Sequence, residues 1–319
     1  MDIVVTGAAG FLGAEVVAAL LRRGELRGQE ISRVVTVDRV APAVEVDGAG
    51  PRLVPAVGDI ADPDLLDAVV DQDTGVVFHL AAVVSGQAEV DHELGARVNV
   101  DGTRRLLEAC RRAGSTPVVV FASSLAVYGG ELPPVVDDVT PLWPSSTYGT
   151  QKAIGELLLA DHTRKGFVDG RALRLPTICV RPGAPNRAAS SFLSGIIREP
   201  LAGVPAVCPV PPETQVWLAS PESAVANLVA GAEVDLGSDR RGVNLPGVSV
   251  SVGEMVQALA EAAGPEVAEL VRWEPDPAVD AIVRTWPART DISRAVAAGF
   301  RADAGFGDLL AAHLRRIGR

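Results

Sequence analysis

Residues 3–13 read Ile3-Val4-Val5-Thr6-Gly7-Ala8-Ala9-Gly10-Phe11-Leu12-Gly13, and this stretch decides the fold of the 319-residue chain. Its β-branched opening predicts a short strand, and the helical apolar spacing from Phe11 to Leu21 predicts a helix directly after the glycines. Glycines let the backbone turn sharply, and a helix N-terminus favours negative charge. A plain turn is one explanation of the loop. The other, which the context favours, is a nucleotide pyrophosphate bound by Gly7, Gly10, Phe11, Leu12 and Gly13.

The same unit of strand and helix repeats through the first half of the chain. Helix-length segments such as 62–70 and 94–113 separate further continuous apolar strands, which are predicted at 34–37, 53–57, 76–80, 118–121 and 172–175. Strands that are apolar on both faces and alternate with helices are typical of a parallel sheet covered on both sides. The expected fold class is therefore α/β, with a Rossmann-type doubly wound parallel sheet.

The pattern changes after about residue 178, where proline and glycine become frequent and the alternation of strands and helices breaks up. We expect a Rossmann-type dinucleotide-binding domain at 1–178 and a smaller α+β lobe at 179–319, which mainly binds substrate and could return elements to the first domain. Serine caps in that lobe predict helices at 220–232 and 251–263, and the tail from 289 to 319 is expected to be helical and amphipathic.

The composition argues against several classes of partner. A formal charge of −11 and a pI near 4.9 disfavour nucleic acid or an anionic membrane surface. Cys110, Cys179 and Cys208 are odd in number and widely spaced, which argues against a disulfide framework or zinc site and favours a reducing compartment. Because no run approaches a membrane-spanning length and Met1-Asp2 leads directly into a strand, we expect a cytoplasmic protein that acts on a small molecule without a metal.

Asp38 ends the second predicted strand, where a carboxylate can accept hydrogen bonds from the ribose hydroxyls of a dinucleotide. An acidic group at this position repels a 2′-phosphate, which favours NAD over NADP. Arg39 leaves the alternative open, because a guanidinium can pair with that phosphate. A solvated surface charge is the simpler explanation of Arg39.

The loops after the third and fourth strands fall at the carboxyl edge of such a sheet, which is the usual ligand crevice. Asp59 could face the adenine amino group, with Ile60 against the ring. Leu80 is followed by Ala81 and Ala82, whose small side chains permit close approach of a cofactor. Each of these residues is also compatible with an ordinary strand end.

Tyr148 and Lys152 lie four residues apart in a chain that has two tyrosines and two lysines. Positions i and i+4 share one face of a helix, so the ammonium would favour the phenolate, which could move a proton near neutral pH. Ser123 and Ser124 follow the fifth strand, and a hydroxyl there can bind the oxygen that the tyrosine deprotonates. A surface Tyr/Lys pair and a serine turn are the plain alternatives.

Together these motifs resemble the extended short-chain dehydrogenase/reductase superfamily of NAD-dependent epimerases and dehydratases, over about residues 1 to 180. The resemblance rests on the glycine loop, Asp38, Asp59, 80–82, Asn99-Val100-Asp101-Gly102-Thr103, Ser123-Ser124 with 126–129, and Tyr148-x-x-x-Lys152. It implies that Tyr148 is the catalytic base, that Lys152 binds the nicotinamide ribose and lowers the tyrosine pKa, and that Ser124 holds the reacting oxygen. It adds as cofactor contacts Asn99, Ser123, Tyr148, Lys152 and Pro176. A buried role in positioning its helix is the alternative for Asn99.

The substrate half departs from the members that act on nucleotide-diphosphate sugars. Thr177 stands where an asparagine commonly contacts the diphosphate, and the segment 215–221 lacks a common arginine. The remaining detail resembles a branch that oxidises C2 of four-carbon sugar acids such as D-erythronate. A small hydroxy acid needs a cation for its carboxylate, and Arg181 is the candidate, although it could merely brace a turn. The expected substrate contacts are Ser85, Ser124, Tyr148, Thr177, Arg181, Asn186 and Ser191.

The resemblance thus implies NAD-dependent oxidation of a C2 hydroxyl to a 2-keto acid. It also implies a homodimer joined through the helices around 95–113 and 146–165. Two alternatives remain: a nucleotide-sugar epimerase or dehydratase that reoxidises its cofactor in each cycle, and an NAD-binding protein without catalysis. His79 and Trp217 are expected to be structural core residues.

Overall fold

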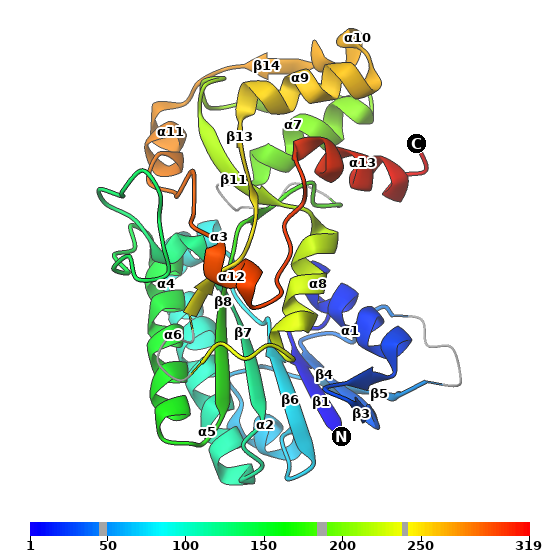
Figure 1. Ribbon diagram of the computed structural model, residues 1–319, viewed down its shortest axis with the longest axis vertical. Helices are drawn as coiled ribbons and strands as arrows, with labels where there is room; N and C mark the ends of the chain where they lie inside the picture. Colours follow the sequence, from blue (N-terminus) through cyan, green and yellow to red (C-terminus); the bar gives the residue numbers. More distant parts are fainter. Residues whose placement is uncertain (45–49, 184–189, 238–241) are drawn as a thin grey trace.

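The computed structural model describes residues 1–44, 50–183, 190–237 and 242–319. Its centre is a seven-stranded sheet with the order β5-β4-β1-β6-β7-β8-β12, in which every neighbouring pair is parallel (Figure 1). The strands are β5 (Arg52–Val57), β4 (Arg33–Asp38), β1 (Asp2–Thr6), β6 (Thr74–His79), β7 (Val118–Ser124), β8 (Asp169–Leu175) and β12 (Gly242–Asn244). The doubly wound α/β fold class is confirmed.

Alternate side chains along the strands form two apolar cores, one on each face of the sheet. Ile3 and Val5 of β1 belong to one core, and Val4 belongs to the other. The first core is covered by α1 (Phe11–Arg23) and α8 (Pro221–Gly231), which lie side by side in Figure 1. The second is covered by α2 (Pro63–Val69), α5 (Thr103–Ala113) and α6 (Thr147–Arg164).

The order of the strands reverses at β1, because β4 pairs with one of its edges and β6 with the other. In sheets of this kind, ligands bind outside the carboxyl ends of the strands at such a switch point. The glycine loop follows β1 directly, and residues 80–84 follow β6. The topology therefore brings these two segments together at one edge of the sheet.

A smaller group of elements lies above the carboxyl ends of the strands (Figure 1). Its core is built from buried residues such as Leu193, Ile197, Leu218, Met255 and Leu309. One small sheet has the order β13 (Val248–Ser251), β11 (Gln215–Ala219) and β9 (Thr177–Ile178), and another pairs β10 (Ala206–Cys208) with β14 (Val271–Trp273). The helices are α7 (Ser191–Leu201), α9 (Val252–Ala263), α10 (Pro265–Ala268), α11 (Pro277–Val283) and α13 (Phe306–Arg316).

The second half of the chain also returns an element to the large sheet. β12 pairs in parallel with β8, so the strand at the edge of the sheet comes from beyond residue 178. The three residues Gly-Val-Asn of β12 carry no periodic pattern, and the sequence did not predict this strand. The helices expected at 220–232 and 251–263 form as α8 and α9, and Ser251 with Glu254 makes the capping box.

The tail from 289 to 319, which was expected to be helical, is helical only in part. The structure has a short α12 (Ser293–Ala297), then a turn at Gly299, whose φ is +100°, and then α13. A second unpredicted element is a π-helical turn, η1 (Ala96–Gly102), between α4 (His92–Gly95) and α5. Along the described parts of the chain, no helix combines the length and the apolar character that crossing a membrane requires.

Candidate active site

The glycine loop packs so closely that side chains are excluded at two of its positions. Gly7 has a φ of +72°, and a Cβ there would lie 2.5 Å from the amide nitrogen of Ala81. A Cβ on Gly13 would overlap the carbonyl oxygen of Gly7. The first position therefore joins the ends of β1 and β6, and the second joins the loop to the helix that follows it.

The start of α1 is suited to an anion. Its N-cap is the exposed Gly10, and within this described segment no side chain caps the helix and no acidic residue occupies the first turn. The amide groups of that turn are consequently open to a ligand, and the helix dipole favours negative charge. Asp38 lies beside the loop, because its carboxylate accepts hydrogen bonds from the amides of Ala9 at 2.9 Å and Arg39 at 2.6 Å. These residues fit the pyrophosphate and adenosine ribose of a dinucleotide.

The residues assigned to the adenine side of the crevice have protein partners of their own. Asp59 accepts a hydrogen bond from the amide of Ala61 and forms an ion pair with Arg97. Although burial opposes it, these contacts hold the pKa of Asp59 below its usual value. Ile60 is buried and lies against Gly102 of the π-helical turn. The contacts to adenine remain predictions.

The side chain of Asn99 is buried and forms hydrogen bonds with protein groups. Its side chain accepts a hydrogen bond from the amide of Val83 at 2.8 Å and donates to the carbonyl of Val83 at 3.0 Å and to Gln151 at 2.6 Å. It thereby fixes the segment after β6 to α6, the helix of Tyr148 and Lys152. This is the positioning role that was the alternative for Asn99. The residue lies in the π-helical turn η1, and such turns are frequent at functional sites.

The segments that carry Ser124 and Tyr148 pack directly against each other. Ser124 ends β7 and caps η2 (Leu125–Val127), because its hydroxyl accepts a hydrogen bond from the amide of Ala126. Gly149 in the first turn of α6 lies against the carbonyl oxygen of Ala126 with no room for a Cβ. The residue before Gly149 is Tyr148, so the close approach that Gly149 allows brings the first turn of the tyrosine's helix against the segment that follows β7.

Replacing Gly149 with alanine should separate these segments. The added Cβ would meet the backbone of Ala126, which cannot rotate away as a side chain could. We expect a loss of about 2 kcal/mol in the free energy of unfolding, and reduced turnover in the protein that remains folded. Urea denaturation measures the first effect. Gly307→Ala is the matched control, because a Cβ at that helical position meets no atom within 4 Å; equal effects of the two changes would contradict this account.

Lys152 reaches from α6 to the end of β7. Its ammonium donates to the carbonyl of Ala122 at 2.8 Å and lies 5.6 Å from the ring centroid of Tyr148 and 4.7 Å from that of Phe121. The side chain is buried, and burial lowers the pKa of Lys152 to about 8, while the nearby Glu156 carboxylate raises it. The pairing of phenol and ammonium on one helical face, expected from the sequence, is present.

The pKa of Tyr148 differs from the expectation of a lowered value. Burial raises the pKa of Tyr148 to about 12, and the charge that opposes this effect is Arg181, not Lys152. The reciprocal effect is present too, since burial lowers the pKa of Arg181 and Tyr148 acts against it. The side chain of Arg181 therefore lies within electrostatic range of the tyrosine, although 33 residues separate them in the sequence.

The backbone of Arg181 is held by α7. Its amide donates to the hydroxyl of Ser194 at 3.0 Å, and its carbonyl accepts from Arg198 at 2.8 Å. Along the described residues, the guanidinium of Arg181 has neither a hydrogen-bond partner nor a carboxylate within ion-pair distance. A cation that is desolvated and left without a partner beside Tyr148 is suited to bind an anionic ligand.

The other expected substrate contacts are only partly assembled. Ser85 begins α3 (Ser85–Val90), Pro176 is buried between β8 and β9, Thr177 begins β9, and Ser191 begins α7. Within the described parts of the chain, no hydrogen bond joins Ser85 or Thr177 to Ser124, Tyr148 or Arg181. Asn186 lies outside the described residues. These roles remain predictions, as does a cofactor contact by Ser123, whose buried hydroxyl donates to Glu156.

Sequence reasoning placed His79 in the core but missed what it connects. Thr103 donates its hydroxyl to the carbonyl of Asn99, so it must accept from His79 Nε2 at 2.8 Å. The other ring nitrogen, Nδ1, then accepts from the Thr6 hydroxyl at 2.7 Å. These buried hydrogen bonds connect Thr6, the residue before Gly7, through His79 and Thr103 to the π-helical turn η1, which is itself bonded to α6. Nothing in a single sequence pairs these threonines with the histidine, since the three side chains, from β1, β6 and α5, meet only in the folded protein.

The stability of the protein should depend on pH through His79. Burial, with the positive charge of Lys152, lowers the pKa of His79 from 6.5 to about 3. Below pH 6.5 the unfolded state takes up a proton that the folded state refuses, so stability present above pH 6.5 is lost as pH falls toward 3. From pH 7.5 to 5.5 we expect a loss of about 1.4 kcal/mol from this group, measured by urea denaturation. His79→Gln should remove that share of the dependence; an unchanged slope would contradict the assignment.

Comparisons with known proteins agree with the geometry. The model of the NAD dependent epimerase/dehydratase family matches residues 3–217. The chain is 56% identical over 324 residues to a D-erythronate dehydrogenase of Cupriavidus necator, with 100% of this chain and 99% of that protein covered. A D-erythronate dehydrogenase of Haemophilus influenzae is 42% identical over 312 residues, with 97% and 98% covered. A solved structure, described as a nucleoside-diphosphate-sugar epimerase from Agrobacterium tumefaciens, is 41% identical, with a TM-score of 0.94 and coverage of 100% of this chain and 95% of that one.

The family match includes the glycine loop, the serine at the end of β7, the pair on α6 and the segment that carries Arg181. Both curated relatives align over nearly their whole length, so the similarity is not confined to the dinucleotide-binding half. The resemblance stated from the motifs is confirmed. The chain belongs to the NAD dependent epimerase/dehydratase family.

Proposed function

We propose that this protein is an NAD-dependent dehydrogenase that oxidises the C2 hydroxyl of a small sugar acid, D-erythronate or a close analogue, to the 2-keto acid. The observation that carries the proposal is the partly buried guanidinium of Arg181, which lies within electrostatic range of Tyr148 and has no ion-pair partner among the described residues. It would hold a carboxylate one carbon away from the hydroxyl that reacts. The two curated relatives named above, each a D-erythronate dehydrogenase, support the same substrate class.

Each residue of the site would have a separate task. Arg181 would pair with the substrate carboxylate, and the hydroxyl of Ser124 would bind the C2 oxygen. Tyr148 would take the proton from that oxygen as a phenolate. Lys152, whose ammonium has donors beyond the one it gives to the Ala122 carbonyl, would bind a ribose hydroxyl and stabilise the negative charge on the phenol. The bound nicotinamide supplies the hydride chemistry, and the protein supplies position and proton transfer.

We further propose that the cofactor is NAD, not NADP. The carboxylate of Asp38 is fixed by two amides at the point where the adenosine ribose would lie. A 2′-phosphate there would meet a negative charge at close range. Comparison of the two cofactors at equal concentration tests this, and equal kcat/KM for both would contradict it.

The assay for the function is the appearance of NADH at 340 nm with a panel of four- to six-carbon aldonates. We expect D-erythronate to give the highest kcat/KM, with net reduction of the cofactor. A nucleotide-sugar epimerase, the activity that describes the solved structure from Agrobacterium tumefaciens, would instead reoxidise its cofactor and release no NADH. Turnover of a nucleotide sugar without net NADH would establish that alternative. NADH binding without turnover of any compound would indicate a non-catalytic protein.

A homodimer is the assembly we propose, joined through the helices around 95–113 and 146–165, with α3 beside them. Leu157 on α6 is 67% exposed and Val90 on α3 is 76% exposed, and a groove runs between these helices past Ile154. Apolar side chains of this kind on neighbouring helices would be covered by the same faces of a second copy. Light scattering should give the mass of two chains, and Leu157→Glu should shift it toward one.

The three cysteines are buried free thiols, in keeping with the cytoplasmic location proposed from the sequence.

A further inference from the structure

Helix α6 forms side-chain hydrogen bonds with two successive residues at the end of β7, Ala122 and Ser123, which directly precede Ser124. The ammonium of Lys152 donates to the carbonyl of Ala122, and the carboxylate of Glu156 accepts from the hydroxyl of Ser123 at 2.5 Å. Because Lys152 and Glu156 are four residues apart, both project from one face of the helix. The spacing between the helix of Tyr148 and the strand of Ser124 is therefore set by these two contacts and by the packing of Gly149.

The carboxylate of Glu156 is itself fixed by a buried ion pair. Arg174 on β8 donates from Nε to both oxygens, at 3.0 and 3.1 Å, and from Nη2 to Oε2 at 2.7 Å. Both side chains are 6% exposed. The remaining nitrogen of Arg174 donates to the Tyr128 hydroxyl at 2.6 Å, and that hydroxyl is also bonded to Asn244 on β12 at 2.8 Å. Glu156 thus has a balanced charge and little freedom to move.

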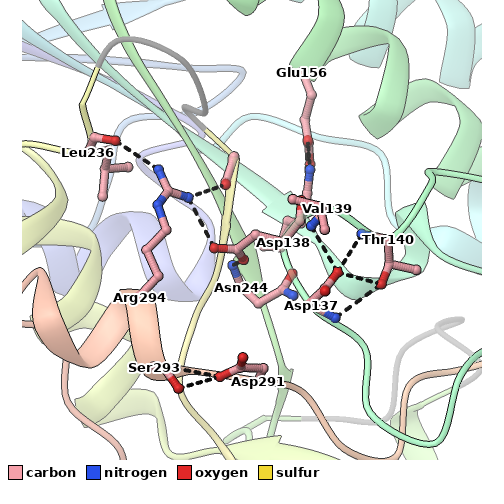
Figure 2. Close-up of polar contacts among 12 residues, drawn as sticks. Asp137, Asp138, Val139, Thr140, Glu156, Leu236, Asn244, Asp291, Ser293 and Arg294 are labelled. Carbon is pink, nitrogen blue, oxygen red and sulfur yellow. Dashed lines mark hydrogen bonds and ion pairs between the residues drawn. The ribbon is translucent and has the colours of Figure 1, made fainter.

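The loop that carries Asp138 and the C-terminal segment that carries Arg294 extend this network of hydrogen bonds (Figure 2). Asp138 accepts hydrogen bonds from the amide of Asn244 at 2.7 Å and from Arg294 on α12 at 3.0 Å. Arg294 also donates to the carbonyl oxygens of Leu236 and Gly242. The polar contacts around Glu156 are therefore continuous with the strand and helix that the second half of the chain contributes.

We propose that Glu156 is a positioning residue, whose carboxylate holds the end of β7 against α6 and so sets the place of Ser124 relative to Tyr148, while its charge supports the ammonium of Lys152. The proposal rests on the function proposed above, because that function gives Ser124, Tyr148 and Lys152 their roles. Glu156 acts on the reaction only through these neighbours.

The electrostatic part of the proposal concerns Lys152 and the groups around it. Tyr148 and Glu156 face it from its own helix, His79 lies on β6, and Arg174 and Arg181 belong to β8 and the segment after β9. Burial lowers the pKa of Lys152, and Glu156 is the group that raises it. His79 is neutral at working pH, so loss of the Glu156 charge would remove the carboxylate that raises the pKa of Lys152.

The positioning role is tested by two variants that each remove one hydroxyl between α6 and the sheet, one beside Glu156 and one far from it along the helix. Ser123→Ala removes the contact with Glu156 and leaves the ion pair with Arg174 intact. Thr163→Ala is the matched control, because the Thr163 hydroxyl also ties α6 to the sheet, through the amide of Gly170 at 3.1 Å, but near the opposite end of the helix. We expect kcat to fall about tenfold in the first variant and less than about twofold in the second, with NADH binding unchanged in the second. A matching loss of NADH affinity in Ser123→Ala would assign its effect to the cofactor contact predicted for Ser123 and overturn the positioning role.

The charge is tested through the lysines, of which the chain has two. Protein labelled with ¹³C at the lysine ε-carbon gives one signal for buried Lys152 and one for exposed Lys165, and Lys165→Arg assigns them. In Glu156→Gln, we expect the Lys152 titration to move down by about 1 pH unit and that of Lys165 to stay in place. Glu156→Asp, which keeps the charge and shortens the reach, should retain the titration and lose kcat as Ser123→Ala does.

The outcomes separate this inference from the proposed function. If wild-type protein oxidises no sugar acid, the function is wrong, and the lysine titration still reports whether Glu156 acts on Lys152. If wild-type protein turns over and Ser123→Ala behaves as Thr163→Ala does, the positioning role is overturned and the function stands. If Glu156→Gln fails to fold, Ser123→Ala and Glu156→Asp decide the result. An unchanged Lys152 titration in folded Glu156→Gln overturns the electrostatic part.

Discussion

Tyr148→Phe should lower kcat for oxidation of the sugar acid by about 1000-fold and leave the affinity for NADH unchanged. The ring remains in place near Lys152, so the site keeps its shape and loses the group that accepts the proton. Stopped-flow and steady-state assays at 340 nm measure the first effect, and quenching of protein fluorescence by NADH measures the second. A variant that binds NADH and keeps more than about a tenth of wild-type kcat would show that another group is the base.

The pH profile gives a second measure of the same residue. Burial raises the pKa of Tyr148 to about 12, so in the free protein the phenolate forms only at high pH, and oxidation should accelerate as pH rises. The positive charge of Arg181 lowers the pKa of Tyr148, against the effect of burial. A substrate carboxylate that neutralises Arg181 would weaken this lowering. The alkaline rise of kcat/KM should be absent from the residual activity of Tyr148→Phe.

The parts of the site that were predictable from sequence are those set by local chemistry. Gly7 and Gly13 stand where a side chain would collide with backbone, and such positions leave glycine in the sequence at a fixed spacing. Tyr148 and Lys152 share a helical face by their spacing alone. The strands were visible because both faces of the sheet are covered, which requires continuous apolar runs.

The parts that escaped prediction depend on contacts between distant segments. β12 is three residues long and is a strand only because β8 lies beside it. The ion pair of Glu156 with Arg174 joins a helix to a strand, and either residue alone is compatible with an exposed surface charge. The pKa of Tyr148 had the wrong expected direction, because the sequence reveals a neighbouring charge but not how completely the folded protein removes water from the phenol.

Arg181→Ala should raise the KM for the sugar acid by about 100-fold and change the affinity for NADH by less than about twofold. The reason is that the guanidinium is desolvated and, along the described residues, carries no carboxylate partner, so a substrate carboxylate would form its main ion pair. Loss of a charge-assisted, two-point contact of this kind costs about 1.5–3 kcal/mol. Arg181→Lys should recover only part of the loss, because an ammonium cannot make the paired contact of a guanidinium.

The decisive comparison uses a substrate that lacks the charge. With the amide of the same sugar acid, Arg181→Ala and the wild-type protein should have similar kcat/KM, because the interaction that the variant removes is already missing. Arg284→Ala is the control for a general effect of losing an arginine, since Arg284 is exposed and paired with Asp280 by an i,i+4 contact on the surface. If Arg181→Ala impairs the acid and the amide equally, then Arg181 braces the turn before Pro182 and the carboxylate is bound elsewhere.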